Sequence, residues 1–319
     1  MVPNLRFSYK GDWSKRKLNE ICQFFKGNGL SKSDLSNEGF PCILYGELYT
    51  TYKNEVISDI ISKTNTTLAN PFLSRNNDLI IPGSGEDPID IAVARAIYQN
   101  DIILGGDLNI LRPKSNVSAA FLSYQLNGVR RYDIAKKAQG KSIVHLHNSD
   151  LKEVLVSIPT YDEQLHIVEL LTKIDEMIDA QIKIIDDYNS LKIGIYNWMF
   201  KENYADYKLK QLAYIVKGDQ INNDQLLSNG SYYMMNGGTS PSGYLDSYNV
   251  SENTISISEG GNSCGYVQFN SSPFWSGGHC YTIQNVNSAL IDNKYLYHYL
   301  KHKEKEIMNL RLLFTDKQK

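Results

Sequence analysis

The strongest constraint on the fold of this chain is an internal repeat. Two stretches of sequence follow the same order of apolar runs and glycine turns, first at a shift of 191 residues and then at shorter shifts because loops are deleted. Each match alone is weak, but several in the same order indicate one scaffold used twice. The matched segments, first copy and then second, are residues 17–21 and 208–212, 42–46 and 233–237, 77–81 and 253–257, 105–107 and 277–279, and 121–124 and 295–298.

Each copy consists of short β-prone runs separated by Gly, Asn, Ser and Pro, followed by a short helix. Two long loops, residues 52–75 and 83–89, carry much of the length difference between the copies. A common frame with divergent loops favours two recognition domains of different specificity, and a duplicated scaffold without a recognition role is the alternative. In the first copy we expect strands over residues 41–45, 78–81 and 102–104, and a helix over residues 117–125.

The sequence between the copies has a different pattern. Thr160, followed three residues later by Glu163, has the spacing of a capping box, and residues 160–200 contain no proline and one glycine, Gly194. Apolar residues then recur at alternating steps of four and three, which is the heptad pattern of a coiled coil. A single polar position, Gln181, can fix the register of such a seam. The seam consists of Leu170, Ile174, Met177, Gln181, Ile184, Tyr188, Leu191, Ile195 and Trp198.

A helix over residues 162–200 would be about 58 Å long, at about 1.5 Å per residue. This exceeds the length of an ordinary packing helix, so we expect another long helix to lie along the seam. The alternative is a helix that lies on a single globular domain.

The composition excludes several classes of protein. Hydrophobic residues make up 42% and charged residues 21% of the 319, which supports two or three globular domains. No apolar run approaches the length of about 18 residues that a membrane helix needs, and the first residues contain no signal-peptide core. The four cysteines (Cys22, Cys42, Cys264 and Cys280) form no CxxC pair, which argues against a disulfide framework or a cysteine zinc site and favours the reducing cytoplasm.

The charge balance gives no basic signature for the chain as a whole, since the net charge is −2 and the pI is near 6.3. A DNA-binding chain of this kind must gather its Lys and Arg on one surface or take positive charge from a partner. The 22 tyrosines, against three tryptophans, favour either amphipathic recognition surfaces or a tyrosine-rich β core.

The order of copy, long helix and copy resembles the specificity subunit of type I restriction–modification systems. The resemblance covers residues 12–310 and implies an α+β fold, with two β-rich target-recognition domains that contain short helices and are joined by a long coiled-coil helix. It also implies that each domain reads half of a bipartite DNA site and that the helices set the spacing. The resemblance is carried by Trp13, Lys17-Leu18, Glu20-Ile21, Gly105-Gly106-Asp107 and, most specifically, Ile158-Pro159-Thr160-Tyr161-Asp162-Glu163-Gln164.

On this basis the second copy departs from the family pattern. It has no counterpart of residues 146–200, so we expect an incomplete second domain and a missing second spacer helix, as after a frameshift, an early stop or recombination. The seam would then pair with the same helix of a second chain or with helices of the methyltransferase subunit. The expected divisions are a first target-recognition domain (residues 1–157), a conserved long spacer helix (158–202), a second target-recognition domain (203–310) and an unmatched tail (311–319).

None of the possible catalytic motifs in the sequence is complete. Asn70-Pro71-Phe72 resembles the loop of amino-methyltransferases but lacks its second proline and a preceding glycine-rich cofactor-binding segment. Asp206-Tyr207-Lys208 has the acid-x-Lys spacing of nucleases without a partner acid, and no phosphate-binding GxxxxGK[ST] sequence occurs. We interpret His145-Leu146-His147, which alternates as a strand would, as structural. The chain is expected to hold no metal.

Candidates for DNA contact are polar loop residues that reach base edges and Lys or Arg side chains that bind phosphates. Lys26 and Lys217 occupy equivalent positions and are expected to contact phosphates. An ordinary surface side chain is the alternative interpretation at every position. The candidates are Lys26, Tyr49, Thr51, Tyr52, Lys53, Ser84 and Arg95 in the first copy, and Lys217, Asn236, Thr239, Ser240, Asn262 and Ser263 in the second.

The resemblance thus implies a non-catalytic DNA-recognition subunit that places an adenine-N6 methyltransferase and a motor endonuclease on a specific sequence, in defence against foreign DNA. The expected partners are double-stranded DNA, methyltransferase subunits, restriction and translocase subunits through the complex, and a second copy of the chain; no membrane is involved. We expect no cofactor on this chain, with S-adenosylmethionine, ATP and Mg²⁺ used by partner subunits. The alternative from another class is a coiled-coil assembly protein without DNA-sequence specificity.

Overall fold

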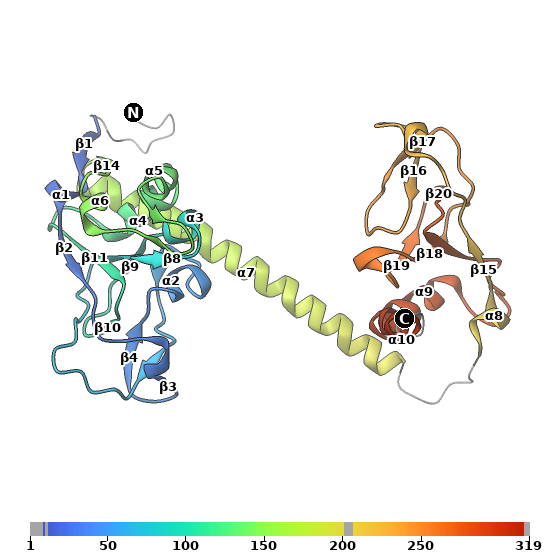
Figure 1. Ribbon diagram of the computed structural model, residues 1–319, viewed down its shortest axis with the longest axis horizontal. Helices are drawn as coiled ribbons and strands as arrows, with labels where there is room; N and C mark the ends of the chain where they lie inside the picture. The colour runs from blue at the N-terminus through green and yellow to red at the C-terminus, as the bar shows by residue number, and fades with distance from the viewer. Residues whose placement is uncertain (1–8, 10–11, 201–206, 316–319) are drawn as a thin grey trace. The chain divides into compact units, whose positions relative to one another are not determined.

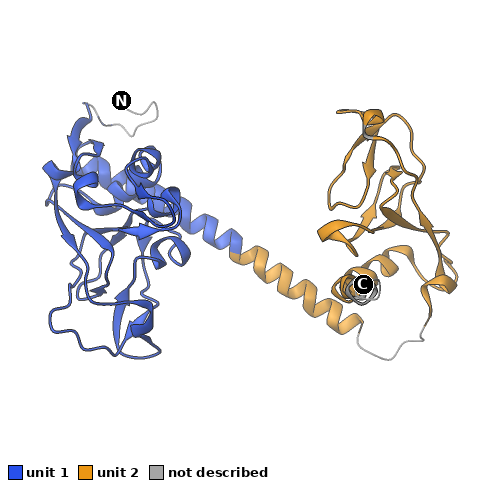
Figure 2. Cartoon of the chain, viewed as in Figure 1, with its two compact units in different colours: residues 1–182 blue, residues 183–319 orange. Residues whose placement is uncertain are grey.

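The computed structural model describes residue 9, residues 12–200 and residues 207–315. The chain divides into two compact units, residues 1–182 and residues 183–319 (Figure 2). The boundary falls inside one continuous helix, α7 (Tyr161–Met199). None of the helices in the described residues combines the length and the apolar character that a membrane span requires.

Unit 1 is built on a five-stranded sheet in the order β2-β11-β7-β9-β5 (Figure 1). Its central strand β7 is buried along its whole length, because alternate side chains enter two different cores. Leu79 and Ile81 pack with Phe121 of α4 (Ala119–Asn127), whereas Ile80 packs with Leu48 of α2 (Glu47–Thr50). The strands are β2 (Cys22–Lys26), β11 (Leu108–Pro113), β7 (Asp78–Pro82), β9 (Arg95–Ile97) and β5 (Val56–Ile57).

Three smaller sheets are also formed by the described residues of unit 1. A four-stranded sheet consists of β10 (Ile103–Leu104), β4 (Phe40–Ile43), β6 (Lys63–Thr64) and β3 (Leu35–Ser36), with η1 (Lys32–Asp34) before β3. A three-stranded sheet consists of β12 (Gln139–Gly140), β13 (Val144–His145) and β8 (Ser84–Gly85), flanked by α3 (Pro88–Ile91) and α5 (Arg131–Ala135). A two-stranded sheet pairs β1 (Ser14–Lys17) with β14 (Leu155–Ile158), beside α1 (Leu18–Ile21) and α6 (Asn148–Lys152).

The described residues of unit 2 form two sheets. The larger one has the order β15 (Tyr214–Lys217), β21 (Cys280–Gln284), β18 (Thr254–Ser258) and β19 (Val267–Asn270). The smaller one consists of β17 (Gly243–Leu245), β16 (Tyr232–Met235) and β20 (Trp275–Ser276). The helical segments are α8 (Leu209–Leu212), η2 (Asn223–Gln225), η3 (Gly261–Ser263), α9 (Asn293–His302) and α10 (Glu304–Thr315).

Strand pairing confirms the internal repeat. The antiparallel run β2-β11-β7 of unit 1 has the same pairing as β15-β21-β18 of unit 2. The parallel pair β4 and β10 likewise corresponds to β16 and β20. Each copy needs a glycine after its first strand of the main sheet, because a Cβ on Gly27 would lie 2.0 Å from the Gly105 oxygen and one on Gly218 would lie 2.3 Å from the Ser276 oxygen.

The predicted mixed fold with a long helix between two β-rich domains is confirmed. Strands expected over residues 41–45, 78–81 and 102–104 are β4, β7 and β10, and the expected short helix is α4. The helix expected over residues 162–200 is α7. The predicted incompleteness of the second domain and the missing spacer helix stay predictions. The segment 311–315 of the expected tail belongs to α10, and residues 316–319 lie outside the described residues.

Candidate nucleic-acid interface

Equivalent loops of the two units lie at one end of the main sheet. In unit 1, Gly83 after β7 donates from its backbone nitrogen to the Asp107 oxygen before β11 (2.6 Å). In unit 2, Glu259 after β18 donates to the His279 oxygen before β21 (2.9 Å). The same loops therefore meet in both units, next to the strand end that carries Lys26 or Lys217.

An ionic cluster lies at this end of unit 2. The Lys217 Nζ lies 2.8 Å from the Glu259 Oε1, and the Tyr281 hydroxyl donates to the same oxygen at 2.8 Å. The Nδ1 of His279 lies 3.6 Å from the other carboxylate oxygen. These contacts, led by the Lys217 hydrogen bond, hold the pKa of Glu259 below its usual value and raise the pKa of Lys217. Lys217 therefore stays a cation at the surface, where a phosphate could replace its carboxylate partner.

Two loops of unit 2 converge on this cluster. The Ser263 hydroxyl donates to the Gly237 oxygen (2.5 Å), and the Asn236 Oδ1 accepts a hydrogen bond from the His279 backbone nitrogen (2.9 Å). The structure thus brings the predicted residues Lys217, Asn236 and Ser263 together around His279. The remaining candidates of this unit, Thr239, Ser240 and Asn262, are exposed on the same loops.

In unit 1 the candidate Tyr49 lies beside Gly85 of β8. Tyr49 is half-buried in α2, and its hydroxyl lies 3.5 Å from the position of a Cβ on Gly85. Burial of its ring raises the pKa of Tyr49, so the phenol remains a neutral donor at physiological pH. Thr51, Lys53 and Lys26 are exposed. These four residues remain candidates for contact with nucleic acid.

Three predicted contacts of unit 1 are wrong, because the structure buries them. Tyr52, Ser84 and Arg95 are 7%, 4% and 7% exposed, and each polar group is used inside the unit. The Tyr52 hydroxyl accepts from the Ile61 nitrogen (3.2 Å), the Ser84 hydroxyl donates to Asp107 (3.2 Å), and the Arg95 Nε donates to the Leu48 oxygen (3.1 Å). Arg95 faces inward because β9 packs beneath α2, a long-range contact that local sequence does not reveal.

The interpretation of His145 and His147 as structural residues stays a prediction. Both side chains are exposed, while Val144 and Leu146, which precede them, are buried. Glu259 and Tyr281 of the unit 2 cluster were not among the site residues predicted from the sequence. The register of the repeat could have found Glu259, because the first residue after β18 corresponds to Gly83 after β7.

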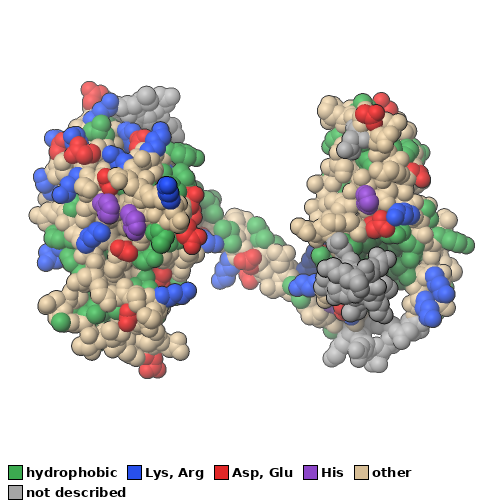
Figure 3. All heavy atoms as spheres, in the orientation of Figure 1, with side chains coloured by type: hydrophobic (Ala, Val, Ile, Leu, Met, Phe, Trp, Pro, Cys, Tyr) green, Lys and Arg blue, Asp and Glu red, His purple; other side chains and the backbone are tan. Residues whose placement is uncertain are grey.

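Charged side chains do not form one large basic patch on the face shown in Figure 3, where Lys and Arg alternate with Asp and Glu over unit 1. Within the part of the chain that the structure describes, no group of three His, Cys, Asp or Glu side chains is placed to hold a metal ion. All four cysteines are free, and burial raises the pKa of Cys22 to about 12 and that of Cys42 to about 11. These two thiols are therefore uncharged and unreactive at neutral pH.

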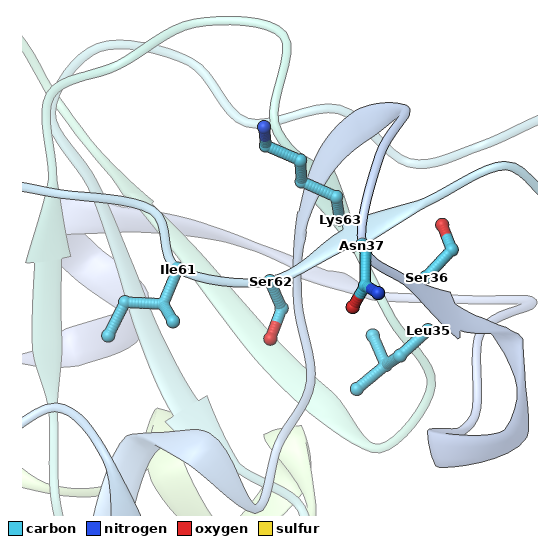
Figure 4. Close-up of a pocket in the computed structure, with 6 residues that line it drawn as sticks. All are labelled: Leu35, Ser36, Asn37, Ile61, Ser62 and Lys63. Carbon is cyan, nitrogen blue, oxygen red and sulfur yellow. The ribbon is translucent and has the colours of Figure 1, made fainter.

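A surface depression of about 340 Å³ lies on the four-stranded sheet of unit 1 (Figure 4). Ser62 in this depression donates its hydroxyl to Glu47, and Figure 4 shows Lys63 pointing away from Ser62 and Ile61. Its polar groups do not converge on a common point, so we assign no ligand to it. The lining residues are Leu35, Ser36, Asn37, Ile61, Ser62 and Lys63.

The start of α7 is fixed to unit 1 by the segment of residues 158–164, the most specific part of the sequence resemblance. The Thr160 hydroxyl accepts from the Glu163 nitrogen (3.4 Å), as the capping box predicts, but the Glu163 Oε1 accepts from the Trp13 indole (3.2 Å). Gln164 is fully buried; its Oε1 accepts from the Ser118 nitrogen (2.9 Å) and its Nε2 donates to the Pro159 oxygen (3.1 Å). The motif therefore ties the helix to the start of α4.

The end of α7 is fixed to unit 2 by aromatic side chains. The Tyr196 hydroxyl lies 2.8 Å from the His298 Nδ1, and the Phe200 ring, just past the helix, lies 5.4 Å from the Tyr295 ring and 5.3 Å from the Tyr299 ring, edge to face. Each end of α7 thus packs against the unit to which it belongs.

The predicted heptad seam is exposed to solvent. The exposed fraction of its apolar residues ranges from 43% at Ile174 and Ile184 to 78% at Trp198, and Gln181 is exposed as well. Ile178 and Ile185, four residues after Ile174 and Gln181, add a second exposed apolar row. Such a band is wider than the seam of a two-stranded coiled coil and is typical of a helix in a bundle. No described residue of the chain covers it.

Comparisons with known proteins give a consistent result. The family model of the type I restriction modification DNA specificity domain matches residues 10–186 and 201–318. Proteins named as type I specificity subunits match at 34% identity over 108 residues in Mycoplasma pneumoniae and at 31% over 105 residues in Mycoplasma genitalium. These stretches cover 34% and 33% of this chain and only 28% and 27% of the two relatives.

The fold is also similar to solved structures. The crystal structure of a type I restriction-modification S subunit from M. genitalium superposes with a TM-score of 0.69 at 18% identity, over 97% of this chain and 82% of that one. A chain from a structure on complex assembly and conformational transition of the type I system gives a TM-score of 0.53 at 15% identity, over 94% of this chain and 82% of that one. At these identities the likeness concerns the fold.

Proposed function

The chain belongs to the family of type I restriction modification DNA specificity domains, and from this premise we propose that it is the DNA-recognition subunit of a type I restriction–modification complex. The observation that carries the proposal is the construction of the same frame twice in one chain, before and after one 39-residue helix. The loops at the equivalent end of each frame differ in length and side chains, as two different DNA readers require.

Each unit is proposed to read one half of a bipartite DNA site. Lys26 and Lys217 end equivalent strands and would bind phosphates, while loop side chains such as Tyr49, Asn236 and Thr239 would reach base edges. The helix α7 would fix the spacing of the two halves. Its contacts through Gln164 in unit 1 and Tyr196 in unit 2 support that role, because they anchor each end of the helix to its own unit.

The exposed band of α7 is proposed to bind the methyltransferase subunits. Two exposed apolar rows, represented by Ile174 and Ile178, offer contact to more than one neighbouring helix, which fits helices of a methyltransferase subunit together with a second copy of this helix. Restriction and translocase subunits would join through that complex. The chain itself would be non-catalytic, with S-adenosylmethionine, ATP and Mg²⁺ used by the partner subunits.

A loop exchange tests the proposal against a coiled-coil assembly protein without DNA specificity. Residues 45–110 would be replaced by the equivalent segment of another recognition domain, and DNA methylation would be mapped with the methyltransferase subunit co-expressed. A changed half-site with the other half retained supports DNA recognition by unit 1. Loss of methyltransferase binding, or an unchanged methylation pattern, contradicts it. The matched control is the same exchange in unit 2 (residues 236–279), which should change the other half only.

A further inference from the structure

The three-stranded sheet of unit 1 presents one apolar face and one polar face. Val144 and Leu146 are 4% and 0% exposed and belong to the core, whereas His145 and His147 point to solvent. This alternation is the two-residue period of an extended strand. The imidazole rings lie nearly parallel, with an interplanar angle of 5° and centroids 6.2 Å apart.

The neighbouring strands extend the polar face. His145 pairs with Gln139 of β12 on one side and with Ser84 of β8 on the other, and cross-strand partners share a face of the sheet. Gln139 is exposed, while Ser84 is buried and donates to Asp107. Gln139, His145 and His147 therefore offer an amide and two imidazoles side by side to the solvent.

This face is held rigidly by the main sheet. The Leu146 nitrogen donates to the Gly83 oxygen (2.9 Å), and the Asn109 side chain donates to the Leu146 oxygen (2.8 Å). The Asn148 side chain donates to the Phe25 oxygen (2.9 Å), which places the end of the polar face beside the end of β2. Lys26, the next residue of β2, is therefore close to the face that carries the histidines.

The chain segment that carries the histidines is basic. Residues 134–149 contain three lysines and no Asp or Glu, in a chain whose net charge is −2. Lys141 is exposed at the turn between β12 and β13, and Lys136 is exposed before β12. Asp107 accepts a hydrogen bond from the Ser84 hydroxyl (3.2 Å), and Asp150 accepts one from the His147 backbone nitrogen (3.1 Å).

We propose that this polar face, made by Gln139, His145 and His147, contacts base edges of the DNA read by unit 1, with Lys141 on an adjacent phosphate. Amide and imidazole groups both donate and accept hydrogen bonds, as the base edges of the grooves require, and lysine binds phosphate as a point charge. The inference rests on the proposed function and adds specificity-determining residues that lie outside the loops of residues 45–110. The sheet positions these side chains more rigidly than a loop could.

The test uses the full chain in complex with its methyltransferase subunit. A duplex that carries the sequence methylated by the wild-type complex is titrated by fluorescence anisotropy at several KCl concentrations, next to a scrambled duplex. The H145A/H147A variant should weaken binding of the specific duplex at least tenfold and bring it close to the scrambled duplex. Lys141→Ala should weaken both duplexes and lower the salt slope by about one. Lys32→Ala, an exposed lysine in η1, is the matched control and should stay within twofold of the wild type.

The outcomes separate the two claims. A wild-type complex without a preferred duplex would overturn the proposed function itself. A wild-type preference that H145A/H147A and Gln139→Ala retain within twofold would overturn this inference alone. Because the replaced side chains are exposed, thermal unfolding and co-purification of the methyltransferase subunit should be unchanged. The H145N/H147N variant keeps polar groups and repeats the measurement if the alanine variant does not fold.

Discussion

Asn77 and Asn253 hold the same place in the two units, each immediately before the central strand and each with a positive φ, 68° and 58°. Hydrogen bonds connect Asn77 to the start of α4 and Asn253 to the start of α9. The Asn77 side chain donates to the Val117 oxygen (2.9 Å) and accepts from the Ala119 nitrogen (2.8 Å), while the Asn253 backbone oxygen accepts from the Asn293 side chain (2.5 Å). The repeat therefore extends to a strained backbone position that asparagine tolerates well.

Asn77→Ala should destabilise unit 1 by about 2–4 kcal/mol, because alanine is strained at a positive φ and the two hydrogen bonds to the start of α4 are lost. Urea unfolding followed by circular dichroism measures the change in the free energy of unfolding. Asn76→Ala, at the exposed neighbouring position, is the control and should change it by less than about 0.5 kcal/mol. Equal effects of the two variants would contradict the assignment.

Two glutamines of α7 should behave in opposite ways. Gln164→Ala leaves the buried Ser118 nitrogen without its acceptor and should cost about 1–3 kcal/mol of the free energy of unfolding. Gln181→Ala alters an exposed seam position, so stability should be unchanged while the affinity for the partner helices changes. Unfolding curves and a pull-down of the methyltransferase subunit measure the two effects. A stable Gln164→Ala protein would show that the entry motif does not anchor the helix.

The ion pair of Glu259 should depend on pH. Its folded-state pKa lies below the usual value of 4.5, chiefly through Lys217. The stabilisation by this pair is therefore fully present above about pH 4.5 and is lost as the pH falls through the lower folded-state pKa. Lys217→Ala should move the pKa of Glu259 back toward its usual value, which carboxyl ¹³C chemical shifts report. Lys210→Ala, an exposed lysine of α8, should leave the titration unchanged; a shift in neither variant would contradict the pairing.

The purified chain alone should bind DNA weakly and with a shallow salt slope. Its net charge is −2, and few lysines lie at each recognition end, so few counterions are released on binding. Addition of the methyltransferase subunit should raise the affinity and steepen the slope. Anisotropy titrations at KCl concentrations from about 50 to about 200 mM measure the affinity and the salt slope. Nanomolar specific binding by the isolated chain at physiological salt would contradict this expectation.

Many of the strands and helices could be predicted, because each depends on a pattern of residues that lie close together in the sequence. Apolar residues in a short run mark β7, the heptad pattern marks α7, and the matched order of the two copies relates Lys26 to Lys217. These signals depend on residues close in sequence. They indicate which elements exist and how the two copies correspond.

The candidate site was harder to predict because exposure depends on distant contacts. Arg95 and Tyr52 are polar residues in apparent loop regions, yet the packing of β9, α2 and the Ile61 backbone turns them inward. By contrast, the alternation over residues 144–147 indicates locally that Val144 and Leu146 meet the core and that both histidines share the other face. The burial of Val144 and Leu146 and the exposure of both histidines agree with this alternation.

The most direct test of the account is a map of N6-methyladenine, obtained by long-read sequencing in a host without its own adenine methylation. The chain would be co-expressed there with the methyltransferase subunit encoded beside it. The account predicts a new split motif methylated in both arms, with two different halves because each unit reads one of them. Co-purification of the methyltransferase subunit without any new methylated motif would contradict it.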